Sequence, residues 1–353
     1  MSFPSPIGGT SFPADFAPSI LFAVLYALLV PLMLYRVYDK RSRTTLLIGS
    51  VIFGVERVVI FSLRAAQSHN ESKRLSKGLL TYMQISFGMG FIGIANDLVN
   101  IMRILLVNAS YGSETYVQSP ASIRKTAQSE DIIPRHHSGD FEGEPPSGTP
   151  DHPRQRFWSR RFSDFTNLAF FAATVPGIIA NSRFSSVLHN PRVAARTMRL
   201  RYVSCGVALF LTSILAVAAF WARVKLARAS RRGTLVMFGL TFLLSIIAVY
   251  RLAVMFHTTT ELGSTAPGSL NSPGAKASFY ILHVLPEWLA TATLFTFNIR
   301  RMYGTGLFGD WRYRDETPKE REKREKREAK RAERRRQKLG TKRDAVADVG
   351  QKD

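Results

Sequence analysis

Ionisable side chains lie inside several of the longest apolar stretches of this sequence. Glu56 and Arg57 interrupt one stretch, Arg251 interrupts another, and Glu287 lies in a third, one helical turn after His283. In lipid, an ionisable group costs at least ~2.5 kcal/mol, so it normally faces protein or a water-filled cavity. The charges of Glu56, Arg57, Arg251 and Glu287 sum to zero. We therefore predict a buried, mutually neutralising polar cluster, with His283 at the same level.

Other polar residues recur at helical spacing and so share helix faces. In the second apolar stretch the face consists of Ser50, Gly54, Arg57 and Arg64. In the third it consists of Ser86, Gly90, Gly93, Asp97 and Asn100. If the third stretch runs inward, Asp97 and Asn100 form a polar face in the inner half of the membrane.

Two interpretations of these residues remain open. In the first, polar pairs hydrogen-bond between helices and fix their packing, each worth about 0.5–2 kcal/mol. In the second, the residues line a cavity that binds a ligand or passes an ion, a proton or a lipid headgroup. Both place the charged groups in the interior of a helical bundle.

No arrangement of residues is typical of an enzyme or a metal site. The single cysteine, Cys205, lies within an apolar stretch, which excludes an intrachain disulfide and a cysteine-based zinc site. His136 and His137 lie in a polar segment without partner ligands. The glycines at 88, 90 and 93 match a dinucleotide fingerprint by letters, but they lack the preceding strand that it requires. We expect no catalytic residue, metal or cofactor.

Seven apolar stretches are long enough to cross a bilayer, which requires about 20 residues per helix. They cover residues 16–35, 44–63, 78–96, 165–182, 202–222, 233–256 and 277–299. The fourth is the weakest, because it contains Asn167, Pro176 and Gly177. We expect an all-α polytopic membrane bundle of seven transmembrane helices, three within residues 16–109 and four within residues 165–300.

Basic residues in the connections predict the orientation, because Lys and Arg collect on the cytosolic side. With the N-terminus outside, the inner segments 39–43, 110–164, 223–232 and the tail hold 34 Lys and Arg, against 9 in the outer segments. Without the fourth crossing, either the basic tail or the 39–43 loop would be exported. We therefore expect an outside N-terminus and a cytosolic C-terminus, in the plasma membrane or an endomembrane.

Two further segments have the composition of disordered chain. Residues 1–15 are expected to form a short disordered outer N-terminus. Residues 110–164 are rich in Ser, Pro, Gly and charges of both signs and cannot bury enough apolar surface to fold, which predicts a disordered cytosolic loop. Arg160-Arg-Phe-Ser163 within it resembles a site for basophilic kinases, so Ser163 is a candidate phosphosite. Asn70 begins a glycosylation sequon on the expected outer face.

The C-terminal residues 301–353 form a cytosolic tail in which a charged helix is predicted at 318–339. Thr317 and Glu320 have the spacing of a capping box, and Gly340 suits the helix end. The helix holds 12 basic and 5 acidic residues and no apolar stripe. It is either fully solvated or attracted to anionic lipid headgroups. The net charge of +22 reflects membrane flanks and this tail, so we expect no nucleic-acid partner.

Motifs in the second, sixth and seventh stretches resemble those of a fungal family of seven-helix membrane proteins of unknown function. The motifs are Gly54-Val-Glu-Arg57 through Arg64, Arg251, and Lys276-Ala-Ser-Phe-Tyr-Ile through Glu287. More distantly they are similar to the RTA-like lipid-translocating exporters, which also carry an acidic residue and an arginine in these helices. The resemblance covers residues 18–108 and 200–310, whereas the 110–164 loop and the tail depart from the family. It implies a fungal membrane setting.

Taken together, these features predict an integral membrane protein that carries out transport or lipid handling through its intramembrane polar cluster. Membrane lipids are the expected partners, and the ligand is unassigned. A seven-helix receptor or sensor signalling through the third loop and tail is one alternative, and a non-catalytic membrane scaffold is another. A dry interior would favour the scaffold, a cavity open to lipid or to both sides would favour transport, and a pocket open only outward would favour the receptor.

Overall fold

The chain is described here from a computed structural model. It describes residues 2–119, 121–122, 145–266 and 268–310, together with Glu322, Lys326 and Ala329. The chain divides into a large unit, residues 1–312, and a small one, residues 313–353. Each unit is considered by itself.

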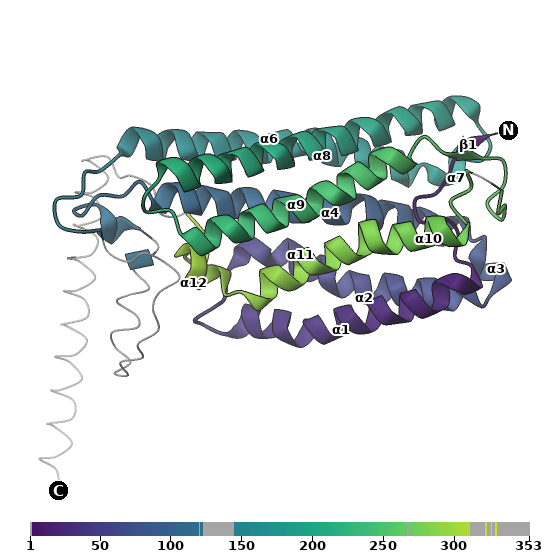
Figure 1. Cartoon of the computed structure of the whole chain (residues 1–353), viewed down its shortest axis with the longest axis horizontal. Coiled ribbons are helices and arrows are strands. Elements are labelled where there is room, and N and C mark those ends of the chain that lie inside the picture. Colours follow the sequence, from purple (N-terminus) through teal and green to yellow (C-terminus); the bar gives the residue numbers. More distant parts are fainter. Residues whose placement is uncertain are drawn as a thin grey trace, which may run out of the picture. The chain divides into compact units, whose positions relative to one another are not determined.

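Six helices of the described residues are long and apolar enough to cross a membrane. They are α1 (Phe16–Tyr38), α2 (Ile48–Ser68), α4 (Lys77–Asn108), α6 (Pro153–Ser182), α8 (Pro191–Lys225) and α9 (Arg231–Val254). They lie side by side along the long axis of the large unit (Figure 1). Their apolar middles correspond to the first six apolar stretches of the sequence. The fold is an all-α membrane bundle.

The last apolar stretch forms a helix with a widened turn. It consists of α10 (Pro273–Phe279), the π-helical turn η4 (Tyr280–Val284) and α11 (Leu285–Thr296), which follow one another along α9. Pro286 lacks an N–H, and its ring crowds the carbonyl four residues earlier, which displaces the α-helical hydrogen bonds just before it. The widened turn therefore lies just before Pro286. In contrast, Pro31 and Pro176 lie inside unbroken helices.

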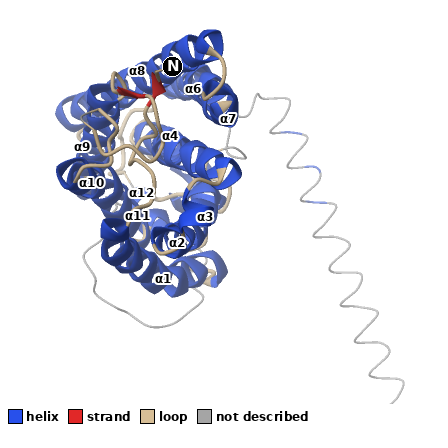
Figure 2. Cartoon of the chain, turned by 90° about the vertical axis from the view of Figure 1, so that its right-hand side faces the viewer, coloured by secondary structure: helices blue, strands red, loops and turns tan. Residues whose placement is uncertain are grey.

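Helix α4 lies at the centre of the bundle. Figure 2 shows it between the pair α1 and α2 on one side and the pair α6 and α8 on the other. Most of its residues are buried, whereas the other long helices expose large apolar side chains on their outer faces, among them Leu28, Phe165, Phe210 and Phe242. An apolar belt of this extent is unfavourable in water but matches the acyl chains of a bilayer.

The N-terminal segment is packed against the bundle. The prediction that residues 1–15 are disordered is therefore wrong for the described residues. Residues 3–11 are buried. The strand β1 (Phe3–Pro4) pairs antiparallel with β2 (Thr258–Thr259), and the short helix η1 (Pro13–Asp15) leads into α1. We call this end of the bundle, where α3 (Glu71–Arg74) and α7 (Phe184–Val187) also lie, the plug end (Figure 1). Hydrogen bonds from the surrounding helices satisfy the buried backbone of this segment, and Phe3 and Ile7 are buried with it.

The flanks of the expected 110–164 loop are also folded, which corrects that prediction for residues 110–119 and 145–164. Helix α6 begins at Pro153, twelve residues before the apolar stretch, because polar contacts stabilise its first turns. Arg156 donates to both carboxylate oxygens of Asp151 at 2.8 and 2.9 Å, and Thr115 donates to Asp151 at 2.6 Å. These hydrogen bonds hold the pKa of Asp151 well below its usual range. Residues 123–144 lie outside the described part of the chain.

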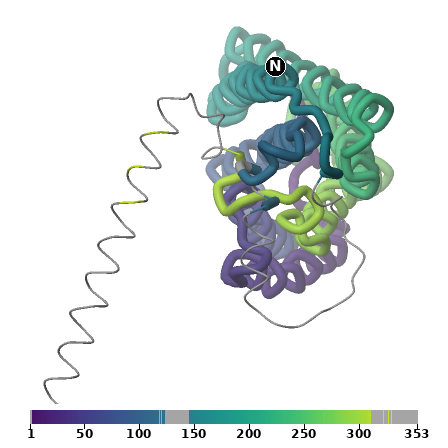
Figure 3. Tube along the Cα trace, turned by 90° about the vertical axis from the view of Figure 1, so that its left-hand side faces the viewer, coloured from purple at the N-terminus to yellow at the C-terminus, as the bar shows by residue number. Residues whose placement is uncertain are grey.

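A cluster of buried ion pairs, which we call the clamp, lies at the end of the bundle opposite the plug end. After α12 (Ile299–Tyr303), the chain turns at Gly304, whose φ of 62° suits glycine. Figure 3 shows the following segment, in yellow-green, beside the end of α4. It brings in Asp310, which is 1% exposed and accepts hydrogen bonds from Arg103 Nε at 3.1 Å and Arg160 Nε at 2.8 Å. The clamp joins α4 and α6 to the segment that leads into the tail.

The small unit is described at three positions only. Glu322, Lys326 and Ala329 are helical, and Lys326 Nζ lies 2.6 Å from Glu322 Oε1. This pair has the i, i+4 spacing that supports a helix. The rest of the predicted 318–339 helix lies outside the described residues.

The clamp yields a prediction for stability. Asp310→Ala removes the carboxylate that faces the buried Arg103 and the partly buried Arg160, which should cost about 3–5 kcal/mol. We expect a clearly lower thermal unfolding midpoint for the purified protein in detergent. Asp164→Ala is the matched control, since Asp164 also pairs with Arg103 but its side chain is 43% exposed, where such a pair contributes at most about 1 kcal/mol. Equal midpoints for the two variants would contradict this role.

Candidate functional site

A buried ion pair joins α2 to α11 in the bundle interior. Arg57 Nη2 donates to Glu287 Oε1 at 2.6 Å, and Arg57 Nε donates to Glu287 Oε2 at 3.2 Å. Both residues are 1% exposed. This two-point geometry matches the guanidinium fork to the carboxylate, which is the strongest form of such a pair. It allows two opposite charges to remain buried in the apolar bundle.

Helix α4 completes the coordination of Arg57. Ser86 accepts a hydrogen bond from Arg57 Nη1 at its hydroxyl and another from Nη2 at its carbonyl, the latter at 3.1 Å. The Ser86 hydroxyl donates to Glu56 Oε2 at 2.8 Å, and the same oxygen lies 3.2 Å from Arg57 Nη1. Gly90 permits this approach, because a Cβ there would lie 2.0 Å from Arg57 Nη2 and 2.1 Å from Glu287 Oε1. The structure therefore brings together Glu56, Arg57 and Glu287.

Arg251 contacts His283 and not a carboxylate, so the structure does not bring all four charges of the predicted cluster into direct contact. Arg251 Nη1 donates to the Phe87 carbonyl at 3.0 Å and lies 3.5 Å from His283 Nε2. Within the described residues Arg251 has no carboxylate partner, and neither its Nε nor His283 Nδ1 makes a hydrogen bond. The aromatic ring of Phe87, which packs 5.5 Å from the Arg57 guanidinium and 6.0 Å from the His283 ring, separates the two sites.

Arg201 on α8 is a further buried arginine, and its burial was not predicted from the sequence. Its guanidinium bonds to Asn181 Oδ1 at 3.2 Å, to Gln84 Oε1 at 3.1 Å and to the Ser5 carbonyl at 3.4 Å. Arg201 was assigned to an outer loop, because the apolar stretch begins only at residue 202. In the structure α8 begins eleven residues earlier, at Pro191, and carries Arg201 into the interior.

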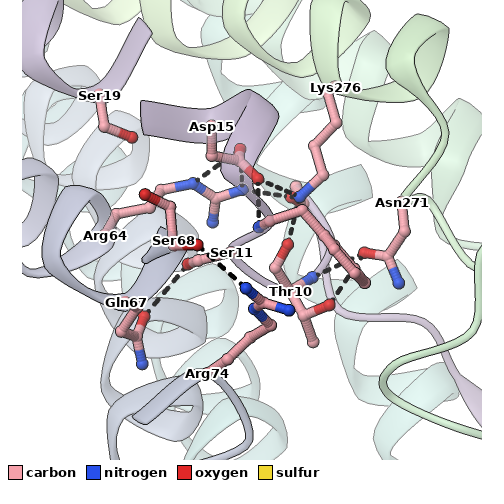
Figure 4. Close-up of polar contacts among 12 residues, drawn as sticks. Thr10, Ser11, Asp15, Ser19, Arg64, Gln67, Ser68, Arg74, Asn271 and Lys276 are labelled. Atoms are coloured by element: carbon pink, nitrogen blue, oxygen red, sulfur yellow. Dashed lines mark hydrogen bonds and ion pairs between the residues drawn. The ribbon is translucent and has the colours of Figure 1, made fainter. Parts of the chain in front are cut away.

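A third charged cluster lies at the plug end (Figure 4). Asp15, which is fully buried, lies between two cations: Arg64 Nη2 is 2.8 Å from its Oδ1, and Lys276 Nζ is 2.5 Å from its Oδ2. The Tyr280 hydroxyl lies 3.1 Å from Asp15 Oδ1 and 2.8 Å from the Ser19 hydroxyl. The sequence placed Arg64 on a polar helix face and Lys276 at the start of a family motif, but it gave no reason to bring them together. Asp15 was not singled out, and its position directly before the first apolar stretch was its only signal.

Asp97 and Asn100, which were predicted to form one polar face, contact different helices. Asp97 accepts hydrogen bonds from the Ser50 amide at 3.1 Å and the Ser50 hydroxyl at 2.6 Å, and no described cation lies within ion-pair distance. Asn100 Oδ1 accepts a hydrogen bond from Asn167 Nδ2 on α6 at 3.1 Å. Asn167 Oδ1 is buried and makes no hydrogen bond within the described part of the chain. Asp97 therefore faces α2, and Asn100 faces α6.

Asn100 and Asn167 line a cleft between α2, α4 and α6. Its volume is about 510 Å³, and Asn96 is its third amide. The remaining lining is largely apolar and includes Phe53 and Phe171, the latter 63% exposed on the outer surface of the bundle. The cleft thus lies between the long helices, is bordered by an exposed side chain of the outer surface, and is lined by three amides. It has the size of many small-molecule sites and mixes apolar walls with a few polar groups, as such sites do.

Ser163 is not available as a phosphosite in this fold, which corrects that prediction. It is fully buried within α6, and its hydroxyl donates to the Ser159 carbonyl at 3.0 Å. His136 and His137 lie outside the described residues. Among the described residues, no group of His, Cys, Asp and Glu side chains could hold a metal ion.

Comparisons with protein-family models, curated proteins and solved structures found no match to this chain.

The close approach at Gly90 yields a prediction. Gly90→Ala places a methyl group where Arg57 and Glu287 meet, and we expect the pair to separate at a cost of about 1–3 kcal/mol from overpacking alone. The thermal unfolding midpoint and the yield of folded protein should both fall. Gly239→Ala in α9 is the control, because nothing lies within 4 Å of its Cβ position and alanine favours a helix. A tolerated Gly90→Ala would refute the tight contact.

Proposed function

We propose that this protein crosses the membrane seven times with its N-terminus outside and binds a membrane lipid in the cleft between α2, α4 and α6, moving it between leaflets. The seventh crossing would be the helix from α10 to α11, which is as long as α9. The outside N-terminus follows from the excess of Lys and Arg at the other end. With this orientation the plug end faces outward.

The cleft is the observation that carries the proposal. A lipid headgroup that enters the membrane interior needs hydrogen-bond partners, because the acyl region provides none. Asn96, Asn100 and Asn167 supply amides at this depth, and the buried Oδ1 of Asn167 makes no hydrogen bond within the described part of the chain. The apolar walls suit the acyl chains that remain attached to the headgroup. The resemblance to fungal RTA-like lipid-translocating exporters points to the same class of activity.

A structural scaffold is the second candidate, favoured by the closure of both ends. Asp15, Arg64 and Lys276 are bonded to one another or to the N-terminal segment, and Asp310 closes the opposite end. A scaffold would require such a rigid interior and would not use the cleft. The two candidates therefore differ in what happens when the cleft is filled.

The cleft can be filled by one substitution. Thr174→Trp places a large side chain in the lining of the cleft, and we expect the transbilayer movement of a fluorescent phospholipid in reconstituted vesicles to fall at least tenfold. The measurement is the fraction of lipid that dithionite reduces from outside over time. Asn167→Leu should lower the rate as well, because it removes an amide but leaves the volume nearly unchanged.

Ser213→Trp is the matched control. Ser213 lies in an apolar surface groove between α6 and α8, outside the cleft, so the same kind of substitution should leave the rate unchanged. If wild-type vesicles moved lipid no faster than protein-free vesicles, transport would be refuted and the scaffold favoured.

For the tail, we propose that the predicted 318–339 helix binds anionic headgroups of the cytosolic leaflet. Its net charge is +7, and each basic residue near such a surface contributes about 1 kcal/mol before the acidic residues subtract. A peptide of residues 313–343 should sediment with phosphatidylserine vesicles at low salt and bind at least tenfold more weakly at high salt. Replacing Lys330, Arg331, Arg334 and Arg335 by Gln should abolish binding. Failure of the unmodified peptide to bind at low salt would exclude this role.

A further inference from the structure

The N-terminal residues 3–12, which we call the plug, fill the plug end of the bundle and contact it mainly through polar groups. Few of their side chains are large and apolar, yet the backbone from Phe3 to Ser11 is buried. The wall around them is polar: Gln84 accepts from the Ile7 amide at 3.0 Å and donates to the Ile7 carbonyl at 3.1 Å. Asn271 accepts from the Thr10 amide at 2.8 Å. The plug is thus held as a polar ligand would be.

Three buried cations of the wall bind carbonyl oxygens of the plug. Arg64 and Lys276 both donate to the Gly8 carbonyl, Lys276 also donates to the Thr10 carbonyl, and Arg201 donates to the Ser5 carbonyl. These cations come from α2, α10 and α8. Figure 4 shows Lys276 and Arg64 directed toward the N-terminal segment from either side.

The charges of this wall do not balance. Asp15 pairs with Arg64 and Lys276 and neutralises one of their two charges. Among the described residues, Arg201 has no carboxylate partner. Carbonyl dipoles of the plug satisfy the remaining donors but carry no net charge. An uncompensated buried cation is costly, so an anion would be held more strongly than these carbonyls.

We propose that the plug occupies an anion-binding vestibule lined by Arg64, Lys276 and Arg201, and that a phosphate or carboxylate group binds there when residues 3–12 are released. The anion is either a soluble one or the headgroup of a lipid, and both present the same oxygen acceptors. The two states exclude each other, because the anion oxygens and the carbonyls of Ser5, Gly8 and Thr10 need the same donors. This vestibule is separate from the cleft between α2, α4 and α6.

Two glycines allow the plug to be displaced without altering the helices. Gly8 and Gly9 have φ values of 79° and 64°, which favour glycine. A Cβ on Gly8 would lie 2.9 Å from the Phe279 ring, and one on Gly9 would lie 2.3 Å from Asn271 Oδ1 and 2.5 Å from the Leu270 carbonyl. Alanine at either position therefore weakens the docked state selectively. Gly263→Ala is the control in the same region, since nothing lies within 4 Å of its Cβ position.

The experiment measures how phosphate binding depends on the plug. Purified full-length protein in detergent is titrated with inorganic phosphate and, in a second arm, with short-chain phosphatidic acid, and the thermal unfolding midpoint is recorded. We expect Gly9→Ala to bind at least one of the two anions about tenfold more tightly than wild type or Gly263→Ala, because plug and anion compete. In the Gly9→Ala background, Arg201→Gln should remove most of this gain. Response to both anions indicates a soluble anion, and response to phosphatidic acid alone indicates a lipid headgroup.

A second measurement applies if Gly9→Ala does not fold. Ile7→Cys with Cys205→Ala provides a single thiol in the plug, and Ile7 is 1% exposed in the docked state. The rate of maleimide labelling should rise severalfold when the anion is added, because the anion releases the plug. Labelling that does not change with either anion, or equal affinities in wild type and Gly9→Ala, would overturn the proposal.

Discussion

The acyl region of a bilayer offers no hydrogen bonds, so every charge in the bundle interior must be compensated by the protein itself. The pair between Arg57 and Glu287 shows how strongly this constrains the fold. Arg57 uses its donors on Glu287, Glu56 and Ser86, which belong to α11, α2 and α4. Because one guanidinium serves three helices, their relative rotation and depth are fixed together. Gly90 is required at the same place, since only a hydrogen side chain leaves room.

The same constraint has different solutions along the bundle. Near its middle, a carboxylate meets an arginine directly. At the plug end, the N-terminal segment supplies carbonyl oxygens in addition to Asp15. Asp97 is compensated only by the amide and hydroxyl of Ser50, and Arg251 by a carbonyl and a histidine. Some buried charges thus have all the partners they need and stabilise the fold. Others have few hydrogen-bond partners and are better suited to binding a ligand.

Much of the helical architecture could be predicted because apolar length is a local property. The stretch at 16–35 appears as α1, and the face that carries Arg57 and Arg64 is buried as its spacing indicates. The ends of the stretches were less informative. Arg201 and Lys276 are polar residues next to apolar runs, and hydropathy assigns such residues to loops, although the structure buries both.

The packing of the N-terminal segment could not be read from composition, because its stability comes from partners distant in sequence. Ser, Pro and Gly indicate disorder when no such partners are known. Here Gln84, Arg201 and Lys276 provide them from three different helices. The early start of α6 has a similar origin, since Asp151 and Arg156 form a contact that an apolar window does not detect.

The π-helical turn at Tyr280–Val284 lets the two parts of the last helix, α10 and α11, direct their side chains independently. A π turn holds one residue more than an α turn, which delays the helix phase by about 100°, the rotation of a single residue. Tyr280 therefore faces Asp15 in the phase of α10, while Glu287 faces Arg57 in the phase of α11. The extra residue therefore sets the rotation of α11 relative to α10. Deleting it would rotate Glu287 off its arginine while leaving Lys276 on Asp15, so the length of this turn is as constrained as the identity of the charges.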